Sequence, residues 1–389
     1  MKALDTTPTR LHYIDWLRVL AVLLLFPFHT GRVFYVGEAF YVKGPQESAL
    51  VTQVGEFIDV WHMPLLFVLA GASTYLALGR RSRREYAFER VRRLLVPFVF
   101  GMLLLIPPQT WYGARFNSGY RGSYLHYLIS GDFLRVEPGR DDFFGGLGTG
   151  HLWFIIFLFV FSLAALPMWG GRLRDDSRLV GLSRVLAHPA GWLLAGLALL
   201  AAETLPEIGG QNPFTYFVFF VLGYLAMCSE EFVDAARRWA WLTFPIGVTG
   251  AVWWVAISGW RNTLADPSTA LAGIGLAGMT AAWLLIIGLL GVGSSLLDRT
   301  SPTLEYLAES SYPVYILHQT AIVAVAFYAV GIDAPWAAQW TAILAVSVAL
   351  TFLCYEGLRR IAWLRFLFGM RPRTSKPSLP SDPRVGHQP

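Results

Sequence analysis

The amino-acid sequence predicts an all-α, polytopic integral membrane protein with about ten transmembrane helices and both termini in the cytoplasm. Apolar residues make up 55% of the 389 positions and charged residues only 15%, with a mean hydropathy of +0.48. Soluble domains rarely combine these values. Apolar stretches long enough to cross a bilayer recur along the chain, and every second connection between them is basic. The basic connections indicate the cytoplasmic side, because Lys and Arg accumulate there.

A hydropathy window of about 19 residues defines the individual membrane segments. We expect helices at 14–36, 55–79, 94–112, 151–169, 190–205, 213–228, 239–259, 269–293, 311–330 and 335–356. The first segment has the position of a signal peptide. Its apolar run is too long for one and it contains Arg18 and His29, so we expect it to remain attached.

The distribution of basic residues sets the orientation and the domain boundary. Arginine and lysine are concentrated at 80–93, 172–184, 237–238 and 299, and beyond 359. The connection at 113–150 is close to neutral, as an external loop can be. We interpret residues 1–370 as one transmembrane domain. Residues 371–389 are rich in proline and poor in apolar residues, so we expect a disordered cytoplasmic tail that cannot bury enough surface to fold.

Several common functional classes have no support in the sequence. Cys228 and Cys354 both lie in apolar stretches, so neither a disulfide framework nor a thiolate metal site is predicted. No metal-ligand spacing, phosphate-binding glycine loop, nucleophile elbow or nucleic-acid motif stands out. The expected function therefore depends on ionisable residues inside the apolar segments.

Arg18 and His29 lie in the first of these segments. Their separation of about three helical turns puts both side chains on one face, roughly 16 Å apart along the axis. An arginine at the bilayer centre costs at least ~2.5 kcal/mol, so both groups are candidates for a functional site. With the predicted orientation, Arg18 lies nearer the cytoplasm and His29 deeper. The plainer alternative for Arg18 is an interfacial arginine that pairs with Asp15.

A polar stripe formed by Glu56, Asp59 and His62 runs along the second segment. His62 is expected at a depth similar to that of His29. Asp59 is one turn away and is predicted to orient the imidazole of His62, which fixes the nitrogen that carries the proton. Alternatively, Glu56 and Asp59 are merely interfacial.

Five sequence motifs then occur in the order typical of one family. They are Asp15-Trp16-Leu17-Arg18 with His29, His62-Met63-Pro64, Arg90 to Pro97, Gly150-His151-Leu152-Trp153-Phe154, and Ser311-Tyr312-Pro313-Val314-Tyr315-Ile316-Leu317-His318. Over about residues 10–365 the chain thereby resembles the membrane-bound acyltransferase family 3, and the first two motifs resemble its glucan-modifying branch. One departure is Ala70-Gly71, where many members have Ser-Gly, so no role is assigned to a serine there.

The resemblance implies transfer of an acyl group from an acyl-coenzyme A, which is a substrate and not a bound cofactor, to a glycan hydroxyl. For the glucan-modifying branch it implies a succinyl group from succinyl-coenzyme A. The expected location is the bacterial inner membrane, and the expected partners are membrane lipid, the donor and the glycan, without nucleic acid or metal.

The residues themselves allow this chemistry. A sugar hydroxyl is a weak nucleophile, and a positioned imidazole that takes its proton contributes typically 10²–10⁴-fold. His29 is the candidate base, and as a nucleophile it could instead carry the acyl group covalently. Arg18 offers a fixed cation for a phosphate or for a carboxyl group on the acyl chain. With His62, these residues form the predicted catalytic group.

Donor-binding residues are predicted near the cytoplasmic side. Arg90 and Arg93 lie immediately before an apolar segment, where they could hold donor phosphates, although such a basic cluster commonly serves only as a topology signal that attracts anionic lipid. Tyr315 and His318 share one face of the ninth segment, and with the family pattern they suit donor binding or an acyl channel. The alternative for this histidine is a helix-packing hydrogen bond.

Acceptor or channel residues are predicted at the outer side. Glu56 belongs to this group, with His151 and Trp153, whose assignment depends mostly on the resemblance because both are also common at a membrane interface.

A rival function from a different class is a multi-pass transporter or exporter of a glycan or lipid. In it, Arg18, His29, His62 and His318 would form a substrate or proton pathway, as intramembrane ionisable residues often do. An enzyme consumes donor in proportion to product, whereas a transporter moves an unmodified solute and responds to a proton gradient.

Overall fold

The computed structural model describes residues 11–135, 142–168, 177–261 and 267–371. Within these ranges the chain is helical throughout its regular structure, and the only β-type pairing is one isolated bridge between Ile208 and Gln211. The predicted all-α class is therefore confirmed. The tail predicted at 371–389 lies outside the described residues apart from its first position.

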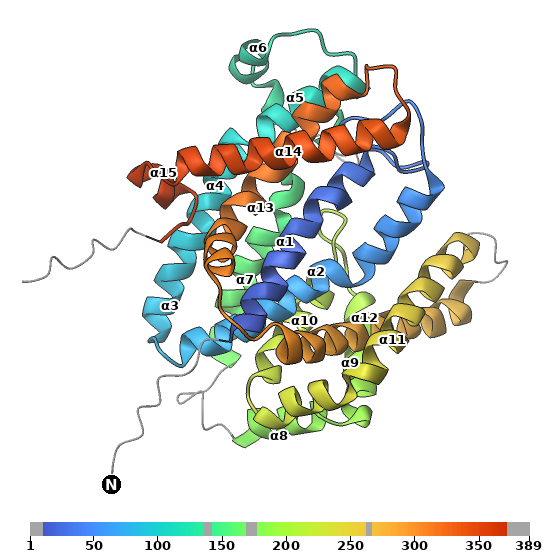
Figure 1. The fold of residues 1–389 in the computed structure, drawn as a ribbon, viewed down its shortest axis with the longest axis vertical. Coiled ribbons are helices and arrows are strands. Elements are labelled where there is room, and N and C mark those ends of the chain that lie inside the picture. The colour runs from blue at the N-terminus through green and yellow to red at the C-terminus, as the bar shows by residue number, and fades with distance from the viewer. Residues whose placement is uncertain (1–10, 136–141, 169–176, 262–266, 372–389) are drawn as a thin grey trace, which may run out of the picture.

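The helices follow one another along the chain as shown by colour in Figure 1. The α-helices are α1 (His12–Arg32), α2 (Ala49–Leu78), α3 (Arg83–Arg90), α4 (Val96–Leu104), α5 (Ile106–Asn117), α6 (Tyr124–Ile129), α7 (Trp153–Met168), α8 (Ser177–Leu186), α9 (Pro189–Glu203), α10 (Pro213–Ala226), α11 (Glu230–Arg261), α12 (Pro267–Leu296), α13 (Pro302–Ala329), α14 (Trp336–Leu358) and α15 (Ala362–Leu367). A π-helical turn, η1 (Val91–Leu95), joins α3 to α4, and short 3₁₀ turns are η2 (Asp132–Leu134), η3 (Asp142–Phe144) and η4 (Gly150–Leu152).

All ten predicted membrane segments coincide with helices, but two of them fall short of a full span. Among the described residues, 8 helices are long and apolar enough to cross a bilayer, or up to 9 if the bent pair α8 and α9 counts as one span. α8 and α9 meet at 100°. α10 has only 14 residues, because Asn212 caps its start and it ends at Ala226, whereas a straight span needs about 20. The polytopic architecture is confirmed, and the side on which the termini lie stays a prediction.

The helices form two groups, one around α1 and one around the pair α11 and α12, and α12 contacts both. α1 packs against α2, α12, α13 and α14, and Figure 1 shows it near the centre of the molecule. α11 and α12 form a long pair at one side of the view, and α12 also packs on α9. The first group surrounds the residues that the sequence singled out on α1 and α2.

Side-chain caps fix where several of these helices begin. Ser82 and Glu85 form a reciprocal capping box at the start of α3. The hydroxyl of Ser301 accepts a hydrogen bond from Leu304 N at the start of α13. Asn212 does the same for α10 and also donates to carbonyls at the end of α9. These caps satisfy backbone N–H groups that a helix cannot satisfy internally.

The crossing of α2 and α10 depends on two glycines. A Cβ atom at Gly71 would lie 1.9 Å from the carbonyl oxygen of Phe220, and one at Gly223 would lie 2.0 Å from that of Val68. The two backbones are therefore in direct contact, as is common where small residues meet in membrane helices. The glycine of the Ala70-Gly71 pair thus has a packing role.

We expect Gly71→Ala to destabilise the folded protein by about 1–3 kcal/mol, because the added methyl group forces the two helices apart. Thermal unfolding of the purified protein in detergent measures this. Gly357→Ala in α14 is the matched control, because a Cβ atom there meets nothing within 4 Å. Equal melting temperatures for the two variants would contradict the prediction.

Candidate active site

Three imidazole rings meet between α1, α13 and the turn before α7. The ring of His318 lies 5.1 Å from that of His29 and 5.1 Å from that of His151, measured between centroids. His318 is fully buried, His151 is buried, and His29 is partly accessible. From the sequence, these residues were predicted to have separate catalytic, donor and acceptor roles, whereas the structure brings them into one cluster. We call these three residues the histidine cluster.

Backbone carbonyls hold two rings of the histidine cluster in fixed tautomers. His318 Nδ1 lies 2.6 Å from the carbonyl oxygen of Tyr315, and His151 Nε2 lies 2.9 Å from that of Ile316. A carbonyl only accepts hydrogen bonds, so each of these nitrogens carries the proton and the other nitrogen of each neutral ring bears a lone pair. Those nitrogens, His318 Nε2 and His151 Nδ1, are buried without a hydrogen-bond partner in the described part of the chain, as is His29 Nδ1.

The turn that carries His151 has its own supports. The carboxylate of Asp142 accepts hydrogen bonds from the hydroxyl of Tyr41 and the backbone N–H of Gly150. Gly150 has φ +48°, a left-handed conformation that favours glycine. The hydroxyl of Tyr315 donates to the backbone carbonyl of His151. The turn is therefore tied both to its own loop and to α13.

His62 lies apart from the histidine cluster, across the ring of Phe28. The Phe28 ring is 5.0 Å from His29 on one side and 6.3 Å from His62 on the other. His62 Nε2 donates to the carbonyl of Ala21 at 2.7 Å and thereby joins α2 to α1. This is a helix-packing contact, and a catalytic part for His62 stays a prediction.

The predicted pairing of Asp59 with His62 requires correction. The contact that orients the His62 ring comes from Ala21 of α1, and Asp59 lines a cavity against α10. Positions three apart differ by about 60° around a helix, since each residue turns it by about 100°. That difference is enough for the two side chains to face different neighbours.

Arg18 makes both the contact that the sequence suggested and one that it missed. Its guanidinium lies 3.0 Å from the carboxylate of Asp15 and donates to the hydroxyl of Ser73 at 2.7 Å. The side chain is 36% exposed, so a charged face remains accessible. The sequence contained a signal for Ser73. The spacing from His62 to Ser73 on α2 equals the spacing from Arg18 to His29 on α1, and the two helices are antiparallel.

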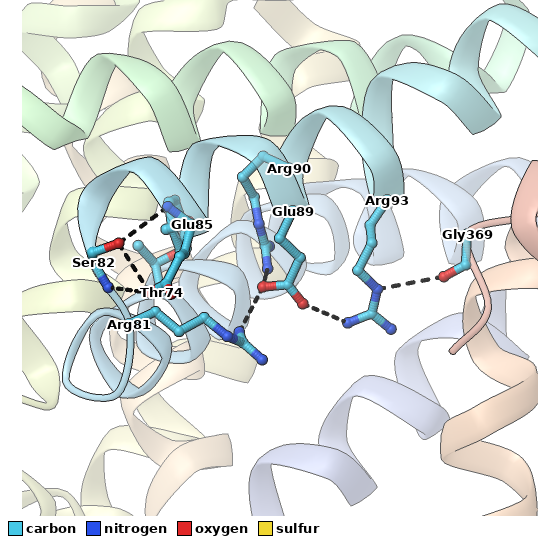
Figure 2. Close-up of polar contacts among 9 residues, drawn as sticks. Thr74, Arg81, Ser82, Glu85, Glu89, Arg90, Arg93 and Gly369 are labelled. Carbon is cyan, nitrogen blue, oxygen red and sulfur yellow. Dashed lines mark hydrogen bonds and ion pairs between the residues drawn. The ribbon is translucent and has the colours of Figure 1, made fainter. Parts of the chain in front are cut away.

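The predicted donor arginines surround one carboxylate, as Figure 2 shows. Glu89 lies 2.5 Å from Arg81, 3.3 Å from Arg93 and 3.6 Å from Arg90. From the sequence, Arg81 was counted only as part of the basic stretch 80–93, and Glu89 was not singled out. We call these four residues the arginine cluster. Three cations share one anion, so the cluster keeps an excess positive charge.

The arginine cluster connects to α13 through the end of the described chain. Arg93 Nε donates to the carbonyl of Gly369 at 3.4 Å (Figure 2). Gly369 in turn lies against the ring of Tyr312, since a Cβ atom there would approach it to 2.7 Å. Tyr312 precedes His318 on α13 by about 9 Å along the helix axis. One helix thus runs from the arginine cluster to the histidine cluster.

A cavity of about 190 Å³ lies between α2, α9, α10, α11 and α12. We call it the acidic cavity, and its polar lining residues are Asp59, Glu203, Glu207, Gln211, Asn212, Thr215, Tyr216 and Trp254. No Arg, Lys or His is among its lining residues, so it does not suit a phosphate. The ring of Tyr216 lies 5.1 Å from that of Trp153. Trp153 therefore packs beside the acidic cavity, whereas Glu56 is not in its lining.

Metal binding has no geometric support at these sites. In the ranges that the structure describes, no group of three or more His, Cys, Asp or Glu side chains is arranged to hold a metal ion. Neutral imidazoles such as those of the histidine cluster can transfer protons and act as nucleophiles.

Comparisons with known proteins agree with the resemblance noted in the sequence. A family model described as an acyltransferase domain matches residues 11–356. Glucans biosynthesis protein C of Salmonella paratyphi B is 22% identical over 403 residues, which cover 95% of this chain and 97% of the relative. The proteins of the same name from Salmonella agona and Salmonella enteritidis are 21% and 22% identical over the same shares of each chain. No solved structure matches.

Proposed function

We propose that this chain, which belongs to the acyltransferase domain family and is a membrane acyltransferase, moves an acyl group from a cytoplasmic acyl-coenzyme A to a glycan hydroxyl. The observation that carries the proposal is the histidine cluster, in which neighbouring imidazole rings have buried nitrogens without partners in the described part of the chain. The name of the relatives supports a glucan as acceptor. The proposed location is a bacterial inner membrane, as the family resemblance implies. The glucan-modifying branch makes succinyl-coenzyme A the first donor to test.

In the proposed reaction, His29 takes the proton of the acceptor hydroxyl as its oxygen attacks the thioester carbonyl. The new C–O bond forms, the C–S bond breaks, and the leaving thiolate takes the proton back from His29. We assign His29 as the general base, because this role needs one accessible ring nitrogen and His29 is partly accessible. A covalent carrier would use the same nitrogen, so the two roles are separated by acid quenching during turnover.

The donor is proposed to bind at the arginine cluster. Its phosphates carry several negative charges, and arginine forms strong paired hydrogen bonds with phosphate oxygens. Arg90 immediately precedes the π-helical turn η1 and Arg93 lies within it. Turns of this type are frequent at functional sites. The acyl arm would then follow α13 from Tyr312 toward His318.

The acceptor is proposed to approach through the acidic cavity. Its carboxylate, amide and hydroxyl groups offer many hydrogen bonds to sugar hydroxyls, and the rings of Tyr216 and Trp254 offer apolar faces. The absence of basic groups from its lining keeps donor phosphates and acceptor hydroxyls at separate places. Trp153 stands between this cavity and the turn of His151.

Purified protein in lipid vesicles tests the proposal. Succinyl- or acetyl-coenzyme A with a labelled acyl group is supplied on one side, with a glucan pool on the other, and the glucan is analysed for label. We expect labelled glucan to appear in proportion to the free coenzyme A released. Movement of unmodified glucan without loss of donor would support a transporter and overturn the proposal.

A further inference from the structure

One ring nitrogen of His318, Nε2, has no hydrogen-bond partner among the described residues. Its Nδ1–H donates to the carbonyl of Tyr315 one turn earlier on α13. The second nitrogen, Nε2, therefore bears a lone pair in the neutral ring. It is fully buried and has no partner among the described residues. Buried polar atoms in native proteins are nearly always paired, so this acceptor calls for a donor.

The neighbouring ring of His151 cannot be that donor. Its Nε2–H is committed to the carbonyl of Ile316, so the nitrogen left over is also a lone pair. The hydroxyl of Tyr315 meanwhile binds the backbone of His151. These bonds lock His151 and His318 to the same turn of α13 and leave each ring with one acceptor nitrogen that has no partner among the described residues.

His29 is the remaining member of the histidine cluster, and its Nδ1 is buried without a partner in the described chain. We propose that His29 Nδ1–H donates to His318 Nε2, which makes His318 the positioning residue of the base. The ring centroids are 5.1 Å apart, and the terminal torsion of histidine is soft, so a small ring rotation closes the bond. The inference rests on the proposed function of His29 as base.

Among the described residues, no carboxylate acts on the His29 ring. The groups that act electrostatically on His29 are His318, His151, Arg32 and His62, none of which is acidic. His62 has its Nε2 engaged by Ala21 and lies beyond Phe28. His318 thus takes the place that an aspartate occupies in a Ser-His-Asp triad, where it holds the imidazole in the correct tautomer and orientation. A neutral acceptor serves this purpose in an apolar bundle without the cost of burying a charge.

The bond would decide which nitrogen of His29 reacts. With Nδ1 protonated and held by His318, the lone pair lies on Nε2. That nitrogen takes the hydroxyl proton during attack and returns it to the leaving thiolate, and no proton passes to His318. His318 steadies the positive charge that His29 carries between these two events.

Two substitutions at His318 separate this role from simple packing. Asparagine places an amide near the position of Nδ1 and keeps a donor toward Tyr315, whereas glutamine places an acceptor oxygen near the position of Nε2. For acyl transfer in vesicles, we expect His318→Asn to lower kcat on the order of 100-fold with unchanged KM for donor and acceptor, because the lost contact acts in the transition state. We expect His318→Gln to recover at least about tenfold of that loss.

A double variant gives a second readout. In a His29→Ala background, His318→Asn should cause little further loss, because residues that act as one unit are strongly non-additive. A full additional loss, or equal kcat for His318→Asn and the wild type, overturns the inference. If the wild type transfers no acyl group, it is the proposed function that fails.

Nitrogen-15 NMR of the imidazoles in the wild-type protein tests the same bond without any variant or activity. We expect protonated Nδ1 and unprotonated Nε2 on His318, and protonated Nδ1 on His29. A protonated Nε2 on His318, or an unprotonated Nδ1 on His29, overturns the inference even if the variants fail to fold.

Discussion

His29→Ala is expected to lower acyl transfer by at least about 100-fold while the protein remains folded in the membrane. Alanine removes the proton acceptor, which contributes typically 10²–10⁴-fold in positioned acid–base catalysis. The ring is only partly buried, and among the described residues the one proposed partner of its Nδ1 is His318, so its loss breaks few native contacts. The measurement is labelled product per mole of protein in vesicles of matched protein content.

His126→Ala is the matched control for this prediction. His126 lies on the short helix α6 with an exposed side chain, so its removal should leave both transfer and abundance unchanged. Normal product formation by a well-expressed His29→Ala protein would rule out both roles considered for this residue. Acid quenching during turnover distinguishes them, since a covalent carrier leaves label on the protein and a general base does not.

Hydropathy located the helices because the bilayer imposes a length and a composition on each span. It was less informative where packing within the protein replaces contact with lipid. The residues 190–205 and 213–228 read as spans from composition alone, yet α9 follows a sharp bend and α10 is short. The direct contact between α2 and α10 at Gly71 also depends on a helix pairing that no local pattern reveals.

The sequence predicted the individual residues of the site, but it did not predict that they lie together. His29, His151 and His318 each stood out as ionisable groups in apolar surroundings. Their convergence depends on how three distant segments pack, so the sequence divided them among separate roles. The same limit explains the correction at Asp59, because helical periodicity gives a shared face without saying which neighbour each side chain meets.

Glu89 was overlooked for a different reason. It lies within a run of arginines whose evident role is to set topology, and a single acid changes that role little. In the folded protein it is the common partner of three arginines, which makes it central to the arginine cluster. Which charges meet is decided by the turn of α3 into η1, a departure from regular helix that sequence patterns do not predict.

Arg93→Ala is expected to raise the KM for acyl-coenzyme A roughly 10–100-fold with a smaller effect on kcat. A hydrogen bond to a charged group contributes about 1.5–3 kcal/mol, and Arg93 is proposed to make one to a donor phosphate. The variant also loses its contact with the carbonyl of Gly369, which joins the arginine cluster to α13. Initial rates at varied donor concentration and fixed glucan measure the effect.

Two further variants make the result specific. Arg84→Ala removes an exposed arginine from α3, the helix that precedes η1, and should leave the KM for donor unchanged. Glu89→Gln removes the anion that lies between the arginines, and we expect it to lower the KM for donor, because the phosphate no longer competes with a carboxylate for Arg90 and Arg93. If both Arg93→Ala and Glu89→Gln left the donor dependence unchanged, the arginine cluster would be a topology signal and the donor would bind elsewhere. If the arginines contact the donor's phosphates directly, Arg93→Ala raises the KM for donor and Glu89→Gln lowers it. If the Arg93–Glu89 ion pair were only structural, losing either partner would change this KM in the same direction.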